Sequence, residues 1–276
     1  MTSIIKTKSN ILVIIFLLIF LFSSRVWAAD SQIAVSTMSI DVSSVPGQNV
    51  STTFTVYNLG DEIEEVYIDT GDWDYDFEGN NRILPPLSIE KSLANWLQIT
   101  PSYFVLDKGE QKRVELSINI PHEEVGPYWG LAFVKNNPKL TGETEEVNGR
   151  STKMYASQTY AIKVNYTDVN NNQKEGKIVK ASVNYDKNSL LNFETVFENL
   201  GNSFLEPKGK IEIINEDGQQ VDVVNIKKFM VLPGYKRKIQ TPYNKDLSAG
   251  NYVAIFVLDY NAEELIGAQL EFEVSM

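Results

Sequence analysis

Residues 50–60 read VSTTFTVYNLG, and this stretch decides the fold class. The apolar residues Val50, Phe54 and Val56 alternate with serine and threonine, and Asn-Leu-Gly closes the run. Successive side chains of a strand point to opposite faces, so one set is expected in a core and the other in water. Residues 114–120 and 270–274 repeat the pattern, with Gly, Pro, Asn and Asp between such runs. The sequence therefore predicts an all-β chain of antiparallel sandwiches.

Three landmarks occur twice and in the same order. They are TVYNLG at 55–60 and TVFENLG at 195–201, VLDKG at 105–109 and VLPG at 231–234, and GPY at 126–128 and GNY at 250–252. An ordered repeat indicates two copies of one module. We therefore predict two tandem immunoglobulin-like β-sandwich domains, residues 30–168 and 175–276, separated near the polar run DVNNNQ at 168–173.

The first 29 residues have the pattern of a secretory signal peptide. Lys6 and Lys8 precede an unbroken apolar run over residues 11–22, and residues 26–28 (VWA) offer small side chains at the −3 and −1 positions of a cleavage point. We expect a protein that is exported, to the periplasm or another exported compartment, and that is soluble after cleavage, with no integral membrane segment. The segment carries three cations and no acid, so its removal changes the net charge from −11 to −14.

The composition excludes several kinds of site. A chain with no cysteine forms no disulfide and no thiolate zinc site. The single histidine, His122, lies beside two glutamates and is expected to be an exposed turn residue, because a metal needs further ligands. The negative net charge disfavours nucleic acid as a partner. An acid pair for hydrolysis is left open by the 36 acidic residues, but none is singled out. We expect no enzyme, no cofactor and no metal.

The first domain also carries a set of motifs in a recognisable order. They are NLG at 58–60, ITPSYFVL at 99–106, GEQKRV at 109–114, YWGLAFV at 128–134 and QTYAIKVNY at 158–166. Over residues 33–166 this order resembles the N-terminal domain of the PapD-like periplasmic pilus-assembly chaperones. The resemblance implies two immunoglobulin-like domains set at an angle. It also implies a chaperone that holds an incomplete pilus subunit by lending it a strand.

Carried over to this sequence, the resemblance implies a client-binding face on the last strand of the first domain. The residues of that face are Tyr155, Ser157, Thr159, Ala161 and Lys163. The expected partner is a pilin-like or other secreted surface protein, and Lys163 matches the family's lysine for the client's C-terminal carboxylate. The family's second cation, an arginine in the first strand, has no counterpart, because no Lys or Arg occurs between residues 30 and 81. An ordinary core-facing edge strand is the equal alternative.

A stretch of alternating acids and aromatics supports another hypothesis, a binding or structural module of the cell envelope. Its surface patch is expected to consist of Asp72, Trp73, Asp74, Tyr75 and Asp76, and to contact glycan or a surface protein. Three carboxylates at this spacing also invite Ca²⁺, whereas a charged outer face that blocks aggregation is the simpler interpretation. A second resemblance, to sandwich proteins of Gram-positive cell surfaces, is carried by residues 96–99, 107–110 and 118–121.

One region of the first domain shows no clear strand pattern. Residues 136–151 contain one proline, two glycines and three glutamates. We expect a long mobile loop there, before the last strand of the domain.

Overall fold

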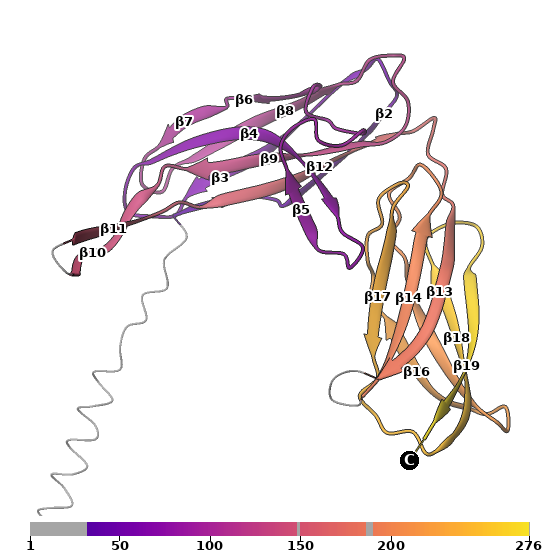
Figure 1. Ribbon diagram of the computed structural model, residues 1–276. Coiled ribbons are helices and arrows are strands. Elements are labelled where there is room, and N and C mark those ends of the chain that lie inside the picture. The colour runs from indigo at the N-terminus through magenta and orange to yellow at the C-terminus, as the bar shows by residue number, and fades with distance from the viewer. Residues whose placement is uncertain (1–31, 148–149, 186–189, 276) are drawn as a thin grey trace, which may run out of the picture.

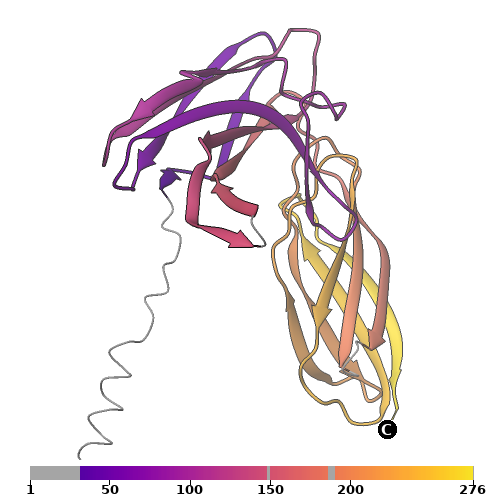
Figure 2. The same ribbon diagram turned by 60° about the vertical axis from the view of Figure 1, so that its left-hand side comes forward.

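The computed structural model describes residues 32–147, 150–185 and 190–275, so the expected signal segment lies outside the described residues. These residues form strands and turns arranged as two β-sandwiches that stand at an angle to each other (Figures 1 and 2). The last strand of the first sandwich ends at Asp168 and the first strand of the second begins at Gly176. The all-β prediction of two tandem sandwiches is confirmed.

The first sandwich has one four-stranded and one six-stranded sheet. The four-stranded sheet has the order β1-β3-β8-β6, with bounds Ile33–Val35, Asn49–Asn58, Gln111–Asn119 and Leu97–Thr100. The six-stranded sheet has the order β2-β12-β9-β4-β5, with bounds Ser39–Ser44, Thr159–Asp168, Tyr128–Asn136, Glu64–Tyr75 and Asn81–Leu84, and β7 (Tyr103–Leu106) pairs with β4. The predicted alternation is reflected in the core, where Val114, Leu116 and Ile118 are at most 1% exposed.

The expected long loop before the last strand is a β-hairpin instead. Strands β10 (Lys139–Val147) and β11 (Arg150–Ala156) pair antiparallel and form a ribbon that projects from the first sandwich (Figure 1). The prediction of a loop over residues 136–151 is therefore wrong. Residues 139–147 read KLTGETEEV and show no apolar alternation, so the sequence carried no strand signal there. The break at residues 157–158 separates β11 from β12, which the sequence had suggested to be one strand.

The second sandwich has a three-stranded and a four-stranded sheet. The three-stranded sheet has the order β13-β14-β17, with bounds Gly176–Tyr185, Leu191–Asn199 and Lys236–Pro242. The four-stranded sheet has the order β16-β15-β18-β19, with bounds Gln220–Ile226, Lys208–Asn215, Gly250–Asp259 and Ile266–Val274. Phe193, Phe197 and Phe256 are fully buried between the two sheets.

The repeated Asn-Leu-Gly motif has the same role in both domains. Asn58 Nδ2 donates to three backbone carbonyls, those of Glu62, Leu106 and Asp107, and its Oδ1 accepts the N–H of Gly60. Asn199 Nδ2 donates to the carbonyls of Ser203 and Val231, and its Oδ1 accepts the N–H of Gly201. Leu106 and Val231 belong to the second repeated landmark. Each asparagine therefore ties one landmark to the next, which explains why the motifs recur together.

A third apolar cluster lies where the two sandwiches meet. Trp73, Trp129 and Leu131 of the first sandwich pack with Leu232 of the second, and all four are at most 2% exposed. The tip of the β4–β5 hairpin reaches β17 (Figure 1), where the Lys238 N–H donates to the Phe77 carbonyl at 2.8 Å. The junction thus combines burial with main-chain bonding, and this holds the angle between the domains.

Candidate strand-addition site

Strand β12 is paired on both sides along only part of its length. β9 pairs with residues 159–166, whereas β2 pairs only from Lys163 to Asp168. The N–H of Lys163 donates to the Met38 carbonyl, so odd-numbered residues of β12 direct their backbone groups toward β2. The N–H and C=O groups of Thr159 and Ala161 therefore point to that same side, where no strand of the described residues pairs with them. We call these four groups the open edge.

The structure places the predicted client-binding residues on two strands. Thr159, Ala161 and Lys163 share the outer face of β12, where Thr159 is exposed and Ala161 is half-buried against the junction cluster. Tyr155 lies on β11 and is 62% exposed, and Ser157 lies in the break between the strands. Strand β12 therefore brings three of the five residues together, whereas Tyr155 and Ser157 lie outside it.

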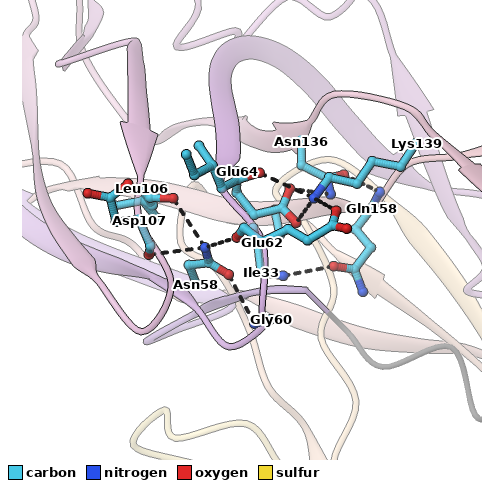
Figure 3. Close-up of polar contacts among 11 residues, drawn as sticks. Ile33, Asn58, Gly60, Glu62, Glu64, Leu106, Asp107, Asn136, Lys139 and Gln158 are labelled. Atoms are coloured by element: carbon cyan, nitrogen blue, oxygen red, sulfur yellow. Dashed lines mark hydrogen bonds and ion pairs between the residues drawn. The ribbon is translucent and has the colours of Figure 1, made fainter.

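A polar network fixes the start of β12 (Figure 3). Asn136, at the end of β9, accepts the N–H of Gln158 on its Oδ1 at 2.6 Å and donates its own N–H to the Gln158 carbonyl at 3.2 Å. Asn136 Nδ2 also donates to Glu64 Oε2 at 3.1 Å. Because Glu64 is fully buried, its carboxylate needs such partners, and they position the first residues of the open edge.

Lys139 supplies the charge that Glu64 requires. Its Nζ lies 2.7 Å from Glu64 Oε1 and 3.2 Å from Glu62 Oε2, at the root of the ribbon (Figure 3). Burial lowers the pKa of Lys139, but the hydrogen bonds to Glu64 and Glu62 outweigh it and leave that pKa above its ordinary value. The ion pair therefore ties the ribbon to β4, next to the open edge.

The N-terminal strand is bound to the same region by the side chains of Gln158, just before β12, and Tyr160, within β12. Gln158 Oε1 accepts the N–H of Ile33 at 3.0 Å, and Tyr160 Oη donates to the Ile33 carbonyl at 2.8 Å. The sequence analysis did not single out Gln158, Tyr160, Asn136 or Glu64. One sequence feature could have located them: Gln158 is a polar residue at a position of the alternating pattern where an apolar, inward-facing residue is expected.

Lys163 lies where the open edge ends and β2 begins. Its Nζ donates to Asn81 Oδ1 at 2.7 Å and to Tyr75 Oη at 3.1 Å, and it lies 3.8 Å from the ring centroid of Trp73. Such cation–π contacts stabilise an ammonium group without neutralising it. Within the described residues, no carboxylate forms an ion pair with Lys163.

The predicted surface patch of acids and aromatics is wrong for three of its five residues. Asp72, Trp73 and Asp74 are at most 3% exposed, because the loop after β5 and the second sandwich cover them. Asp72 accepts the hydroxyl of Ser92 at 2.7 Å, and Asp74 accepts the Arg82 guanidinium at 2.6 Å. These carboxylates are occupied by protein donors and do not form an exposed binding surface.

The other two residues of that patch differ from the buried three. Tyr75 is half-buried beside Lys163, and Asp76 lies in the turn before β5. Hydrogen bonds from Asn80 lower the pKa of Asp76 below its ordinary value. No group of three or more histidines and carboxylates that suits a metal ion occurs in the described part of the chain.

The chain was compared with protein families, curated proteins and solved structures. No family model and no curated protein matches the chain. Among solved structures, the class 5 fimbriae chaperone CfaA is similar at 14% identity over 88% of this chain and 100% of that chain, with a TM-score of 0.45. The CsuC–CsuE chaperone–subunit complex of Acinetobacter baumannii is similar at 12% identity, 85% and 97% coverage and a TM-score of 0.44. The E. coli chaperone DraB is similar at 15% identity, 88% and 98% coverage and a TM-score of 0.42.

The arrangement of the strands itself defines the fold of the molecule. No helix of the described residues is long and apolar enough to cross a membrane. Two immunoglobulin-like β-sandwiches meet at a packed junction, and the last strand of the first one has an open edge. The chain is a protein of two immunoglobulin-like β-sandwich domains.

Proposed function

We propose that this protein is an exported, non-enzymatic, chaperone-like protein that binds a secreted or surface subunit by adding a strand of that subunit to the open edge. The observation that carries the proposal is the pairing of β12, whose Thr159 and Ala161 backbone groups have no partner strand in the described residues. The motifs at residues 58–60, 99–114 and 158–166, which resemble those of PapD-like chaperones, motivate the class of partner.

Strand addition suits the chemistry of this edge. An unpaired strand edge offers donors and acceptors in a row, and an extended peptide satisfies all of them at once. The side chains beside these groups, Thr159 and Ala161, are small, so they fill only shallow pockets of a partner. Main-chain hydrogen bonds therefore supply most of the affinity, and the partner is recognised chiefly as an extended segment.

The blocked end of the edge sets the direction of the added strand. β2 occupies the edge from Lys163 onward, so an added strand ends there. The unneutralised ammonium of Lys163 favours a negatively charged terminus at that point, which is a C-terminal carboxylate. A strand that ends with its C-terminus at Lys163 runs parallel to β12.

A proline substitution tests the proposal. Thr159→Pro removes one N–H of the open edge, which β9 does not use, so the fold is retained. Thr159→Val is the matched control, because it keeps the N–H and a similar side-chain shape. The full chain is purified from an exported fraction, its partner is identified by mass spectrometry, and the affinities of both variants for that partner are measured. We expect a large loss for Thr159→Pro and near wild-type affinity for Thr159→Val; equal affinities of the two would refute strand addition at this edge.

A further inference from the structure

The N-terminal segment changes sheets beside the open edge. Residues 33–35 pair with β3 in the four-stranded sheet, and residues 39–44 pair with β12 in the six-stranded sheet. The change occurs between Ser36, whose N–H donates to the Thr55 carbonyl, and Met38, whose carbonyl accepts the Lys163 N–H. Thr37 Oγ1 bonds both backbone groups of Ser39 and fixes the turn between the two strands.

The open edge exists because the segment leaves β12 at this point. In the parallel register of β2 and β12, Ser39 lies opposite Lys163. The same register continued toward the N-terminus places Thr37 opposite Ala161, and Val35 opposite Thr159. Residues 35–37 would then pair with the groups that we assign to the partner. One segment of this chain is therefore an alternative occupant of the edge.

Two side chains at the start of β12, those of Gln158 just before the strand and Tyr160 within it, form hydrogen bonds with the N-terminal strand in its present position. The N–H of Ser36 and the carbonyl of Gln32 bond to β3, so in this antiparallel ladder the backbone groups of Ile33 point away from β3. Gln158 Oε1 accepts the Ile33 N–H, and Tyr160 Oη donates to the Ile33 carbonyl. Asn136 fixes Gln158 in turn, and Glu64 fixes Asn136 (Figure 3).

We propose that Gln158 and Tyr160 are positioning residues that hold the N-terminal strand on β3, and that they thereby keep residues 35–37 off the open edge. The fully buried Ile33 side chain opposes the exchange as well, since its transfer to β12 takes it out of the core. The inference rests on the proposed function in one respect only, namely that the open edge serves to bind a partner strand. The exchange between two partner strands is a property of this chain alone and is measured without a partner.

Hydrogen–deuterium exchange of the purified full chain tests this role. The double variant Gln158→Ala, Tyr160→Phe removes both bonds to Ile33 and keeps the aromatic ring. We expect slower exchange of the Thr159 and Ala161 amides, by about tenfold or more, with faster exchange of the Thr55 amide of β3, because the exchange takes away its acceptor, Ser36 Oγ. The control Tyr67→Phe removes an exposed hydroxyl that donates to Glu65 and forms no hydrogen bond with β1 in the described part of the chain, and it leaves all three amides unchanged.

The directions in which the amide exchange rates change distinguish this role from simple destabilisation. A variant that merely loosens the sandwich accelerates all three amides, and that result overturns the proposal. Unchanged amides in the double variant overturn it too. If the three amides change as expected but Thr159→Pro binds the partner normally, the strand exchange stands and the proposed function fails.

A disulfide between β1 and β3 is expected to reverse the effect of the double variant. Ala34 and Tyr57 are Cα partners of an antiparallel ladder, at a spacing that suits a disulfide, and the chain has no other cysteine. In the double variant, Ala34→Cys with Tyr57→Cys is expected to return the Thr159 and Ala161 amides to wild-type exchange when oxidised and to leave them slow when reduced. Slow exchange in the oxidised form would show that another segment covers the edge, and would overturn the assignment of residues 35–37.

Discussion

Asn58 and Asn199 show how far single residues organise this fold. Each is at most 1% exposed, and each joins the end of one strand to a turn far along the chain. The sequence repeat located both asparagines, because the motif that contains them recurs with its spacing. The repeat did not reveal the hydrogen-bond partners of the two asparagines, because these partners are backbone carbonyls, which every residue carries.

Asn199→Ala is expected to lower the free energy of unfolding by about 2–3 kcal/mol, because it removes the side-chain donor of the buried Ser203 carbonyl and one of the two donors of the Val231 carbonyl. Urea unfolding, followed by fluorescence, measures the change. Asn80→Ala is the control, since the Asn80 side chain donates to the carboxylate of Asp76 in an exposed turn. Equal losses in the two variants would contradict the structural role of Asn199.

Trp73 illustrates what sequence reasoning misses at this scale. Alternation correctly places Trp73 and the neighbouring aspartates on opposite faces of a strand, and an edge strand with acids suggests solvent. The residues that bury Trp73, Leu232 among them, come from the second domain. Burial that depends on the packing of one domain against another has no local pattern.

At the scale of the strands, the candidate site is defined by which residues of β12 pair with a neighbouring strand and which do not. The sequence predicted the last strand of the first domain and the face that Thr159, Ala161 and Lys163 share. It did not predict where β2 stops or that β10 and β11 form a ribbon, because strand partners depend on the register of distant segments. Glu64 also lacked a signal, since an acid among apolar residues gives no hint of the lysine that balances it.

Glu64→Gln is expected to loosen the root of the ribbon and the start of β12. The substitution keeps a hydrogen-bonding side chain but removes the charge opposite Lys139, at a cost of about 1–3 kcal/mol. Limited proteolysis measures the loosening of the ribbon, and urea unfolding measures the loss of stability. Asp69→Asn breaks an exposed ion pair with Lys135 on the same sheet and is expected to cost less than about 1 kcal/mol. Proteolysis of the ribbon at the wild-type rate in Glu64→Gln would contradict this role.

At the scale of the whole molecule, the junction makes the two sandwiches one unit. Leu232 is fully buried against Trp73 and Trp129. Leu232→Ala leaves a cavity there and is expected to weaken the coupling by about 2–4 kcal/mol. Small-angle scattering should then show a broader range of distances between the domains, with each sandwich still folded. A scattering curve identical to that of the wild type would mean that other contacts alone hold the angle.

The stability of the junction is also expected to fall at alkaline pH, because of Tyr235. Burial, with the nearby Asp74 carboxylate that accepts its hydroxyl at 3.2 Å, raises the pKa of Tyr235 to about 12. A raised pKa means that the folded state holds the proton more tightly than the unfolded state. The contribution to stability is therefore complete below about pH 10 and is lost as the pH rises toward 12.

Urea unfolding of the wild type and of Tyr235→Phe at pH 9 and pH 11.5 checks this dependence. The wild type is expected to lose more stability between the two pH values than Tyr235→Phe, because the variant has no hydroxyl to titrate. Parallel losses in both proteins would exclude Tyr235 as the cause.

The central claim is that a partner adds a strand to the open edge of β12. Hydrogen–deuterium exchange of the full chain, alone and in complex with its co-purified subunit, tests it most directly. The account predicts that the Thr159 and Ala161 amides exchange rapidly in the free protein and become strongly protected in the complex, in wild type and in Thr159→Val alike. A stable complex in which these amides stay unprotected, while another surface becomes protected, would contradict the account.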